Sequence, residues 1–283
     1  MNDNNKHIDS DFFSKASIPF KESKEEIWEK LSNKLTEAPK AKTKVISMTW
    51  FKLAAAVLIL LVAATFFMKF YTTTIESLKG EHLAYTLPDG SIIDLNAASS
   101  ISYHPYWWNF NREVELEGEA FFEVEKGSNF AVVSENGKTE VLGTSFNIFS
   151  RNSYYNVFCK TGKVRVSSTK TDVELIINPG EMAIIDNINN TGSIQNTLSE
   201  NILGWKSNKF NFTSMPLANV IDELERQYNV SISIEIKSLS ELLYTGYFTK
   251  TTSIESTLDL ICQSFDITFV KLEENKYKVL QNK

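Results

Sequence analysis

The chain has 283 residues, of which 42% are hydrophobic, and its formal net charge is −6. This length predicts about two domains, and the apolar content is sufficient for packed cores, which excludes a disordered stalk. Residues 1–69 carry +3 and leave −9 for the remainder, and an acidic body of this kind argues against nucleic acid as a direct partner.

Residues 1–49 form a polar arm with one predicted helix. Ser23 and Glu26 make a capping-box pattern, and Pro39 ends the helical signal. Four apolar residues follow one face at helical spacing: Ile27, Trp28, Leu31 and Leu35. A short helix cannot bury such a stripe alone, so the stripe either docks in a groove of a partner protein or lies on a membrane surface. We favour docking on a protein.

The most apolar stretch is Leu53–Met68, which contains no charge, Gly or Pro. As a helix it is roughly 24 Å long, slightly shorter than a ~30 Å hydrocarbon core. Lysines and aromatic residues on both flanks supply the missing length, since both side-chain types suit the membrane interface. We therefore predict a single membrane span over residues 50–71, with a buried helix of a soluble protein as the alternative.

The orientation of this span follows from its flanking charges. Four lysines without an acid among them precede it: Lys40, Lys42, Lys44 and Lys52. The positive-inside rule therefore places the N-terminus in the cytoplasm and residues 72–283 across the membrane.

Residues 72–200 are predicted to be a connector, up to Lys79, followed by an all-β domain of short strands broken by turns. Pro88-Asp89-Gly90 is typical of a hairpin turn. Glu113–Glu125 alternates acidic and apolar residues, which predicts a half-buried strand pair whose carboxylates form a solvated face. A sandwich and an irregular β-helix both fit this pattern.

Residues 201–283 combine helix and strand patterns. Apolar residues at helical spacing predict helices over residues 216–228 and 254–265, each between strands. Pro216 and Ser253 suit the two helix starts. Two β-α-β repeats in tandem predict a small α+β domain.

The sequence offers little support for catalysis or a cofactor. Its three histidines lack a second His or Cys at metal-ligand spacing, and no nucleotide-binding glycine motif is present. We therefore expect neither an enzyme nor a metal site. Trp107 and Trp108 are a candidate recognition patch, although such aromatics more often plug the end of a β domain. Cys159 and Cys262 are either a disulfide or two buried thiols.

Five segments together resemble the periplasmic domain of FecR-type proteins. They are LPDGSIIDLNAASSISY (87–103), REVELEGEAFFEVEK (112–126), VLGTSFNI (141–148), GKVRV (162–166) and NPGEMA (178–183). Residues 201–283 are similar to the C-terminal domain of Bacteroidetes-type members, which has a secretin/TonB short N-terminal-like fold.

The resemblance implies a transmembrane anti-sigma factor of the bacterial inner membrane. In that family a cytoplasmic arm binds an extracytoplasmic-function sigma factor, and the periplasmic body senses an outer-membrane TonB-dependent transducer. Ile27, Trp28, Leu31 and Leu35 are then the expected sigma-binding residues. The alternative function is a membrane-anchored periplasmic binding module for glycan or envelope components, with Trp107 and Trp108 as its platform.

Overall fold

The computed structural model describes residues 21–36, 48–234 and 237–281. The chain divides into two compact units, Met1–Leu58 and Ile59–Lys283. The predicted helix stop at Pro39 and the lysines at positions 40, 42 and 44 lie outside the described residues.

The first described helix is α2 (Lys24–Thr36). The predicted capping box is confirmed, because the Ser23 backbone amide donates to Glu26 Oε2 at 2.9 Å and the Glu26 amide donates to Ser23 Oγ at 3.2 Å. Glu25 and Glu26 also place negative charge in the first turn, where the helix dipole favours it.

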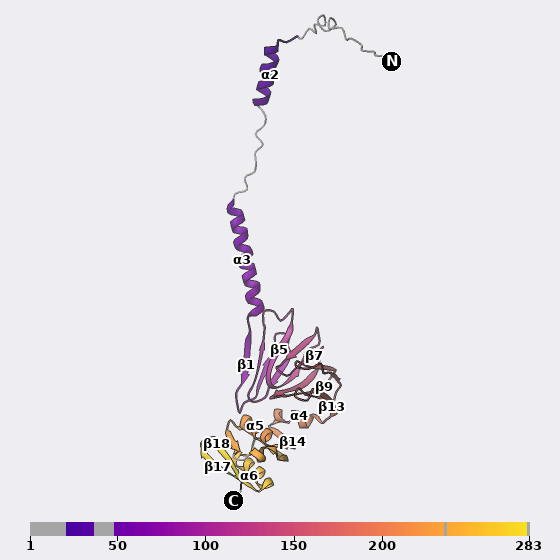
Figure 1. The fold of residues 1–283 in the computed structure, drawn as a ribbon, viewed down its shortest axis with the longest axis vertical. Coiled ribbons are helices and arrows are strands. Elements are labelled where there is room, and N and C mark those ends of the chain that lie inside the picture. Colours follow the sequence, from indigo (N-terminus) through magenta and orange to yellow (C-terminus); the bar gives the residue numbers. More distant parts are fainter. Residues whose placement is uncertain (1–20, 37–47, 235–236, 282–283) are drawn as a thin grey trace, which may run out of the picture. The chain divides into compact units, whose positions relative to one another are not determined.

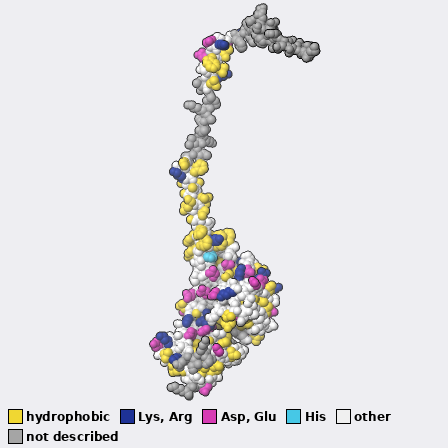
Figure 2. Space-filling view, in the orientation of Figure 1, with side chains coloured by type: hydrophobic (Ala, Val, Ile, Leu, Met, Phe, Trp, Pro, Cys, Tyr) yellow, Lys and Arg dark blue, Asp and Glu magenta, His cyan; other side chains and the backbone are white. Residues whose placement is uncertain are grey.

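The second helix, α3 (Met48–Phe70), contains the predicted span. Its 23 residues extend roughly 34 Å at 1.5 Å per residue, which is enough to cross a hydrocarbon core. Figure 2 shows apolar side chains along its length, and none of its residues is buried in the protein. The alternative of a helix buried in this chain's own core is therefore wrong.

The expected connector after the span is mostly a strand. Only Tyr71 and Thr72 separate α3 from β1 (Thr73–Ser77), which pairs with β4 (Ser99–Tyr103). β-branched residues such as Thr73 and Ile75 suit this strand, but its partner lies more than twenty residues away in the sequence. The helix thus enters the β structure directly (Figure 1).

Thirteen strands follow, in two branches that share β5 (Arg112–Glu123). The first branch runs β1, β4, β5, β6 (Phe130–Val133), β7 (Gly137–Val141), β10 (Val164–Ser168) and β11 (Glu174–Ile177). The second runs β2 (Leu83–Thr86), β3 (Ile92–Leu95), β5, β8 (Ser145–Arg151), β9 (Tyr154–Thr161), β12 (Glu181–Asp186) and β13 (Thr191–Asn196). We call these strands the β body.

The two branches of the β body pack on one apolar core. Ile101 and Val132 come from the first branch, and Phe122 and Ile148 from the second. Strands β5 and β6 pair in parallel, whereas the other pairs of the β body are antiparallel. The predicted all-β character is confirmed, and this pairing is that of a layered β structure rather than of parallel β-helical rungs.

Gly118 is the corner at which β5 passes from one branch to the other. Residues up to Glu117 pair with β4, and residues from Gly118 onward pair with β8. Its φ of 99° lies in a backbone region that glycine adopts readily and other residues rarely adopt. A side chain would also clash here, because an added Cβ would lie 2.6 Å from Ser99 Oγ. Glu113–Glu125 is thus mostly one bent strand, and the predicted strand pair is wrong.

The C-terminal lobe contains helices and strands in alternation. Its elements are α4 (Ser199–Leu203), η1 (Gly204–Ser207), β14 (Lys209–Pro216), α5 (Leu217–Tyr228), β15 (Ser231–Ile234), η2 (Lys237–Glu241), β16 (Leu243–Thr249), α6 (Ile254–Phe265), β17 (Ile267–Glu273) and β18 (Lys276–Gln281). Both predicted helices are present, and Ser253 Oγ caps α6 by accepting from the Ser256 amide.

Strands of the lobe pair across the two repeats rather than within them. β14 pairs antiparallel with β16, and β15 pairs parallel with β18, which also pairs with β17. The lobe has its own apolar core, to which Phe121 of the β body contributes. Cys159 lies in the first core and Cys262 in the second, both as free buried thiols, so the disulfide alternative is wrong.

Candidate functional site at the junction of the β body and the lobe

The predicted apolar stripe of α2 is largely exposed. Trp28 retains 75% of its accessible surface, Leu31 and Leu35 are also exposed, and Ile27 is partly buried. An exposed row of large apolar side chains on a short helix is unfavourable in water, so this face is suited to contact with another molecule.

The predicted pair Trp107 and Trp108 does not form one surface. Trp108 is 3% exposed, and its ring packs edge-on against Tyr103 and Phe130 in the core of the β body. Trp107 is half-buried and lies beside the exposed Phe110, with ring centroids 4.7 Å apart. The recognition interpretation is therefore wrong for Trp108, which is a core plug.

The lobe is fixed to the β body by contacts spread over several elements. The Gly80 amide donates to the Arg226 carbonyl at 2.7 Å, and Lys250 Nζ donates to the Gly80 carbonyl. Lys206 forms an ion pair with Asp94 at 2.6 Å and lies over the Phe121 ring. These contacts join η1, α5 and the end of β16 to the first strands of the β body.

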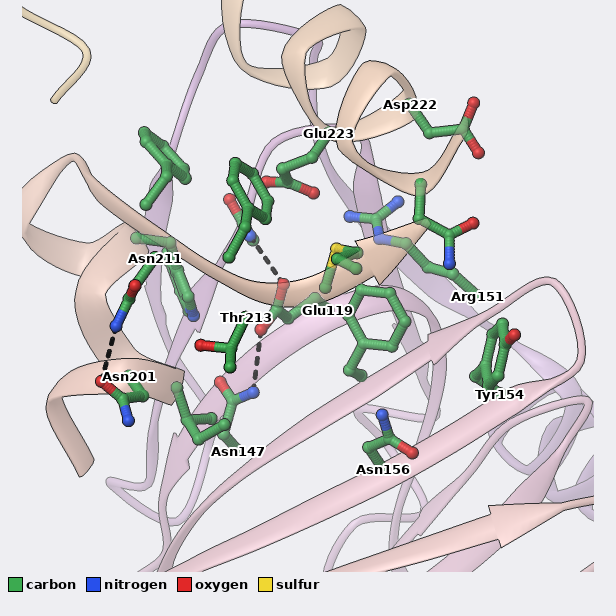
Figure 3. Close-up of a pocket in the computed structure, with 18 of the residues that line it drawn as sticks. Glu119, Asn147, Arg151, Tyr154, Asn156, Asn201, Asn211, Thr213, Asp222 and Glu223 are labelled. Carbon is green, nitrogen blue, oxygen red and sulfur yellow. Dashed lines mark hydrogen bonds between the residues drawn. The ribbon is translucent and has the colours of Figure 1, made fainter. Parts of the chain in front are cut away.

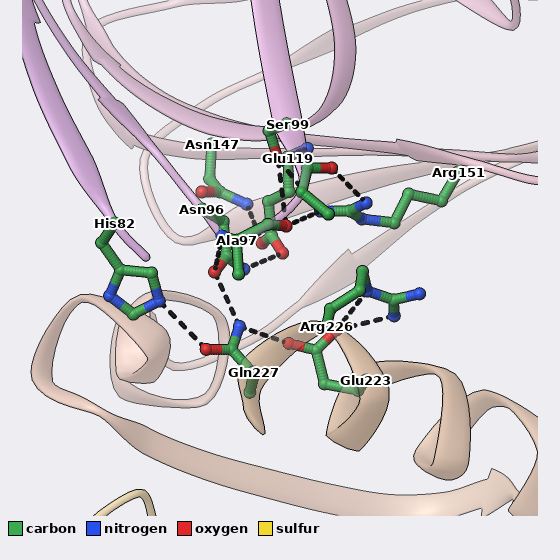
Figure 4. Close-up of polar contacts among 11 residues, drawn as sticks. His82, Asn96, Ala97, Ser99, Glu119, Asn147, Arg151, Glu223, Arg226 and Gln227 are labelled. Carbon is green, nitrogen blue, oxygen red and sulfur yellow. Dashed lines mark hydrogen bonds and ion pairs between the residues drawn. The ribbon is translucent and has the colours of Figure 1, made fainter. Parts of the chain in front are cut away.

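A buried polar network lies at the centre of this junction (Figure 4). Glu119 of β5 accepts from Asn96 Nδ2 at 2.8 Å and from Asn147 Nδ2 at 2.9 Å. Gln227 of α5 donates to Asn96 Oδ1 and to Glu223 Oε1, both at 2.8 Å. Each hydrogen bond satisfies a group that would be costly to bury alone.

His82 and two arginines surround this network. His82 Nε2 lies 3.0 Å from Gln227 Oε1, and its ring packs edge-on against Trp205. Arg151 donates to the carbonyls of Ala97 and Ala98, on the β-body side. Arg226 pairs with Glu223 on the same turn of α5, at 2.7 Å.

The two carboxylates of the network differ in protonation. Burial raises the pKa of Glu119 to about 7, and the charge of Glu223 acts in the same direction. Burial would also raise the pKa of Glu223, but the charges of Arg226 and Arg151, together with hydrogen bonds from Arg226 and Gln227, outweigh it and lower that pKa. Glu223 is thus ionised at neutral pH, whereas Glu119 gains or loses its proton there.

Burial also lowers the pKa of His82, so this ring is neutral at pH 7. A neutral imidazole suits the contact with Gln227, because one ring nitrogen can donate to the amide oxygen. Glu119 is thus a group of the junction whose pKa lies close to neutrality.

A cavity of about 420 Å³ opens beside Glu119 (Figure 3). Strands β8 and β9 form one side, and α4, β14 and α5 form the other. Four polar atoms of its lining residues are buried without a hydrogen-bond partner among the described residues: Asn147 Oδ1, Arg151 Nε, Asn156 Oδ1 and Trp205 Nε1. The lining as a whole combines amide and carboxylate side chains with aromatic rings, which is suited to a small polar molecule.

Glu119 is the residue that sequence reasoning missed. The alternating pattern of Glu113–Glu125 predicts a solvated carboxylate at this position, yet Glu119 is only 7% exposed. From Gly118 onward β5 pairs with β8 instead of β4. The alternation of exposed and buried residues before Gly118 therefore does not predict which residues after it are exposed. Gly118, an isolated glycine inside an alternating strand pattern, was the available sign that the strand is interrupted there. Glu115, Glu117, Glu123 and Glu125 are exposed as predicted.

The described residues contain no group of three or more His, Cys, Asp and Glu that could hold a metal ion. His104, in the loop after β4, donates through Nδ1 to the Tyr71 carbonyl at 3.1 Å. The junction therefore holds two parts of the chain together and contains a buried carboxylate whose pKa lies near neutrality.

The fold is that of a β-rich protein in which the described residues contain one candidate membrane helix, followed by the β body and its docked α+β lobe. Two family models match the chain: "FecR protein" over residues 73–165 and "FecR, C-terminal" over residues 209–279. The chain belongs to the FecR family of anti-sigma regulators.

Solved structures agree with this family. Two crystal structures of a proposed anti-sigma factor from Parabacteroides distasonis ATCC 8503, at 1.65 and 2.50 Å resolution, are 30% identical to this chain. Each match covers 75% of this chain and all of the other, with a TM-score of 0.68. A comparison with curated proteins finds no match.

Proposed function

We propose that this protein relays a signal from an outer-membrane TonB-dependent transducer to an extracytoplasmic-function sigma factor. Residues 1–49 lie in the cytoplasm and hold the sigma factor on the apolar stripe of α2. Residues 50–71 cross the inner membrane once. Residues 72–200 and 201–283 lie in the periplasm, where the transducer binds them.

The observation that carries the proposal is that the residues matched by the FecR models follow an apolar helix whose surface is exposed throughout. The charge distribution supports the orientation, since lysines precede the helix and acids are common after it. The exposed stripe on α2 supplies a face for a protein partner on the other side of the membrane.

The connections within residues 59–283 support a mechanical relay. Tyr71 and Thr72 alone separate α3 from β1, so a movement of the β body is passed to the helix without a flexible linker. The lobe is in turn fixed to the β body through Gln227 and Gly80. A transducer that binds the lobe or the β body can thus shift the orientation of α3.

Capture of both partners by the full chain tests this proposal. The chain carries an affinity tag at its C-terminus, is expressed in the source bacterium, and is extracted in mild detergent after cross-linking. We expect mass spectrometry to identify an extracytoplasmic-function sigma factor and a TonB-dependent transducer. Protease added to intact spheroplasts should digest residues 72–283 and spare the arm. Absence of every sigma factor, or protection of residues 72–283, would contradict the proposal.

The cavity beside Glu119 favours a second candidate function, the binding of a small glycan or envelope component. Its lining combines amide side chains such as Asn156 with the aromatic rings of Trp205 and Tyr154, and both kinds of group suit a small polar ring compound. Calorimetric titration of the full chain in detergent with cell-wall sugars tests this function. We expect binding that Asn156→Leu abolishes and that Asn189→Leu, in an exposed turn, leaves unchanged. An array of such sugars without any binding would exclude it.

A further inference from the structure

The loop His104–Asn111, between β4 and β5, presents aromatic side chains at the surface of the β body. Its backbone is compact, because the Phe110 and Asn111 amides both donate to the Trp107 carbonyl, at 2.9 and 3.1 Å. Trp108 anchors it in the core beneath. Phe110 nevertheless retains 75% of its accessible surface, and Tyr106 is also exposed. The loop therefore has a defined conformation, and its exposed aromatic side chains are accessible to a partner.

The same loop contacts the last turn of α3. The Tyr106 ring lies 5.3 Å from the Tyr71 ring and 6.3 Å from the Phe67 ring, between centroids. The hydrogen bond from His104 to the Tyr71 carbonyl adds a polar contact at the same level. The depth of the loop relative to α3 is therefore fixed by direct contacts.

Lys69 indicates what surrounds the loop at that depth. It is the first charge after the uncharged stretch, and its Nζ lies 5.6 Å from the centre of the Phe70 ring and 6.0 Å from that of Trp107. A lysine that ends a membrane helix places its ammonium among the lipid headgroups, where Trp and Tyr are also favoured. The loop contains no acid that the anionic headgroups would repel.

We propose that the loop His104–Asn111 binds the headgroup region of the membrane that α3 crosses, through Tyr106, Trp107 and Phe110. This inference rests on the proposed function, in which α3 spans the membrane. The partner is the lipid surface itself, because the apolar side chains of α3 and those of the loop are continuous through the contacts of Phe67, Tyr71 and Tyr106. The loop thereby holds the β body against the bilayer in one orientation.

Spin labels on the full chain in vesicles of phosphatidylethanolamine and phosphatidylglycerol test the proposal. The labelled positions are Asn109→Cys in the loop, Leu60→Cys in α3 and Ile188→Cys in an exposed turn. Cys159 and Cys262 are buried, and the unsubstituted chain measures any labelling of them. Collisions of the spin label with molecular oxygen are frequent in lipid, whereas collisions with a water-soluble nickel chelate are frequent in water. The two collision rates therefore show which phase surrounds each label.

We expect the nickel chelate to reach Asn109→Cys severalfold less than Ile188→Cys, with oxygen access retained. Adding Tyr106→Ser and Phe110→Ser should restore nickel access at position 109. If Leu60→Cys lies in lipid while Asn109→Cys is as accessible to nickel as Ile188→Cys, the loop proposal is wrong and the span stands. If Leu60→Cys is also accessible to nickel, the span itself fails. Low access to both reagents at position 109 would indicate a contact between protein copies and would overturn the proposal.

Discussion

Helices α2 and α5 are nearly equal in length, with 13 and 12 residues, and both carry an apolar stripe at helical spacing. In α5 the stripe is buried in the lobe core, whereas in α2 Trp28, Leu31 and Leu35 are exposed. Gln227, on the same buried side of α5, also makes a hydrogen bond to Asn96 of the β body. The difference teaches that the same sequence pattern can serve the chain's own fold or another molecule, and that α2 is available for the latter.

The largest expected effect is a difference in the free energy of unfolding between variants of the two apolar stripes. Leu224→Ala in α5 removes a fully buried side chain and should lower the free energy of unfolding by about 2–5 kcal/mol. Leu31→Ala in α2 should change it by less than about 0.5 kcal/mol, because that side chain is exposed. Chemical unfolding of the full chain in detergent, followed by tryptophan fluorescence, measures both. Equal losses would show that α2 is packed in the fold.

The junction should make the free energy of unfolding depend on pH through Glu119 of β5. Its folded pKa of about 7 lies above the ordinary value of 4.5, so the folded protein holds this proton more tightly than the unfolded chain. The stability from this group is complete below pH 4.5 and is lost as the pH rises to about 7. The full loss is about 3 kcal/mol.

Glu119→Gln isolates this contribution, since glutamine keeps the shape of the side chain and does not titrate. We measure the free energy of unfolding of both proteins at several pH values. As the pH rises from 4.5 to about 7, the wild type should lose stability relative to the variant. Glu123→Gln, exposed on the same strand, is the matched control and should follow the wild type. A constant difference between Glu119→Gln and the wild type would mean that Glu119 keeps one charge state.

A smaller effect is expected where α5 meets the β body. Gln227→Leu removes hydrogen bonds to Asn96 and Glu223 and should cost about 1–3 kcal/mol. The lobe core should remain intact, so hydrogen exchange should increase at the junction and not in α6. Gln195→Leu, at an exposed position of β13, controls for the substitution itself. Unchanged exchange around Asn96 would show that the network does not fix the lobe.

Local periodicity was enough to predict α5, α6 and the hairpin of β2 and β3. In each, the pattern and its ends lie within a few residues, as Ser253 at the start of α6 shows. The two buried cysteines were equally open to two interpretations, because the division into two cores depends on contacts distant in the sequence. The exposed stripe of α2 was predicted from its spacing alone.

The junction could not be predicted in the same way. β1 appeared to be a connector because its partner β4 is remote in sequence, and Glu119 appeared exposed because its partners Asn96 and Asn147 are remote in sequence as well. Gln227 carried a weak signal, as a polar residue three positions after Leu224 on the buried face of α5. Polar residues that contact each other between the β body and the lobe produce no regular pattern in the sequence of either part, so their contact is not predicted from it.

Affinity for the sigma factor is the most direct test of the central claim that the α2 stripe serves a cytoplasmic partner. The full chain in detergent is titrated with the purified sigma factor that it captures, as wild type, as Trp28→Ala with Leu31→Ala, and as Glu29→Ala on the same helix. Two lost anchors of about 2 kcal/mol each predict a roughly thousandfold weaker Kd for the double variant. Glu29→Ala should bind like the wild type. A double variant with wild-type affinity would contradict the account.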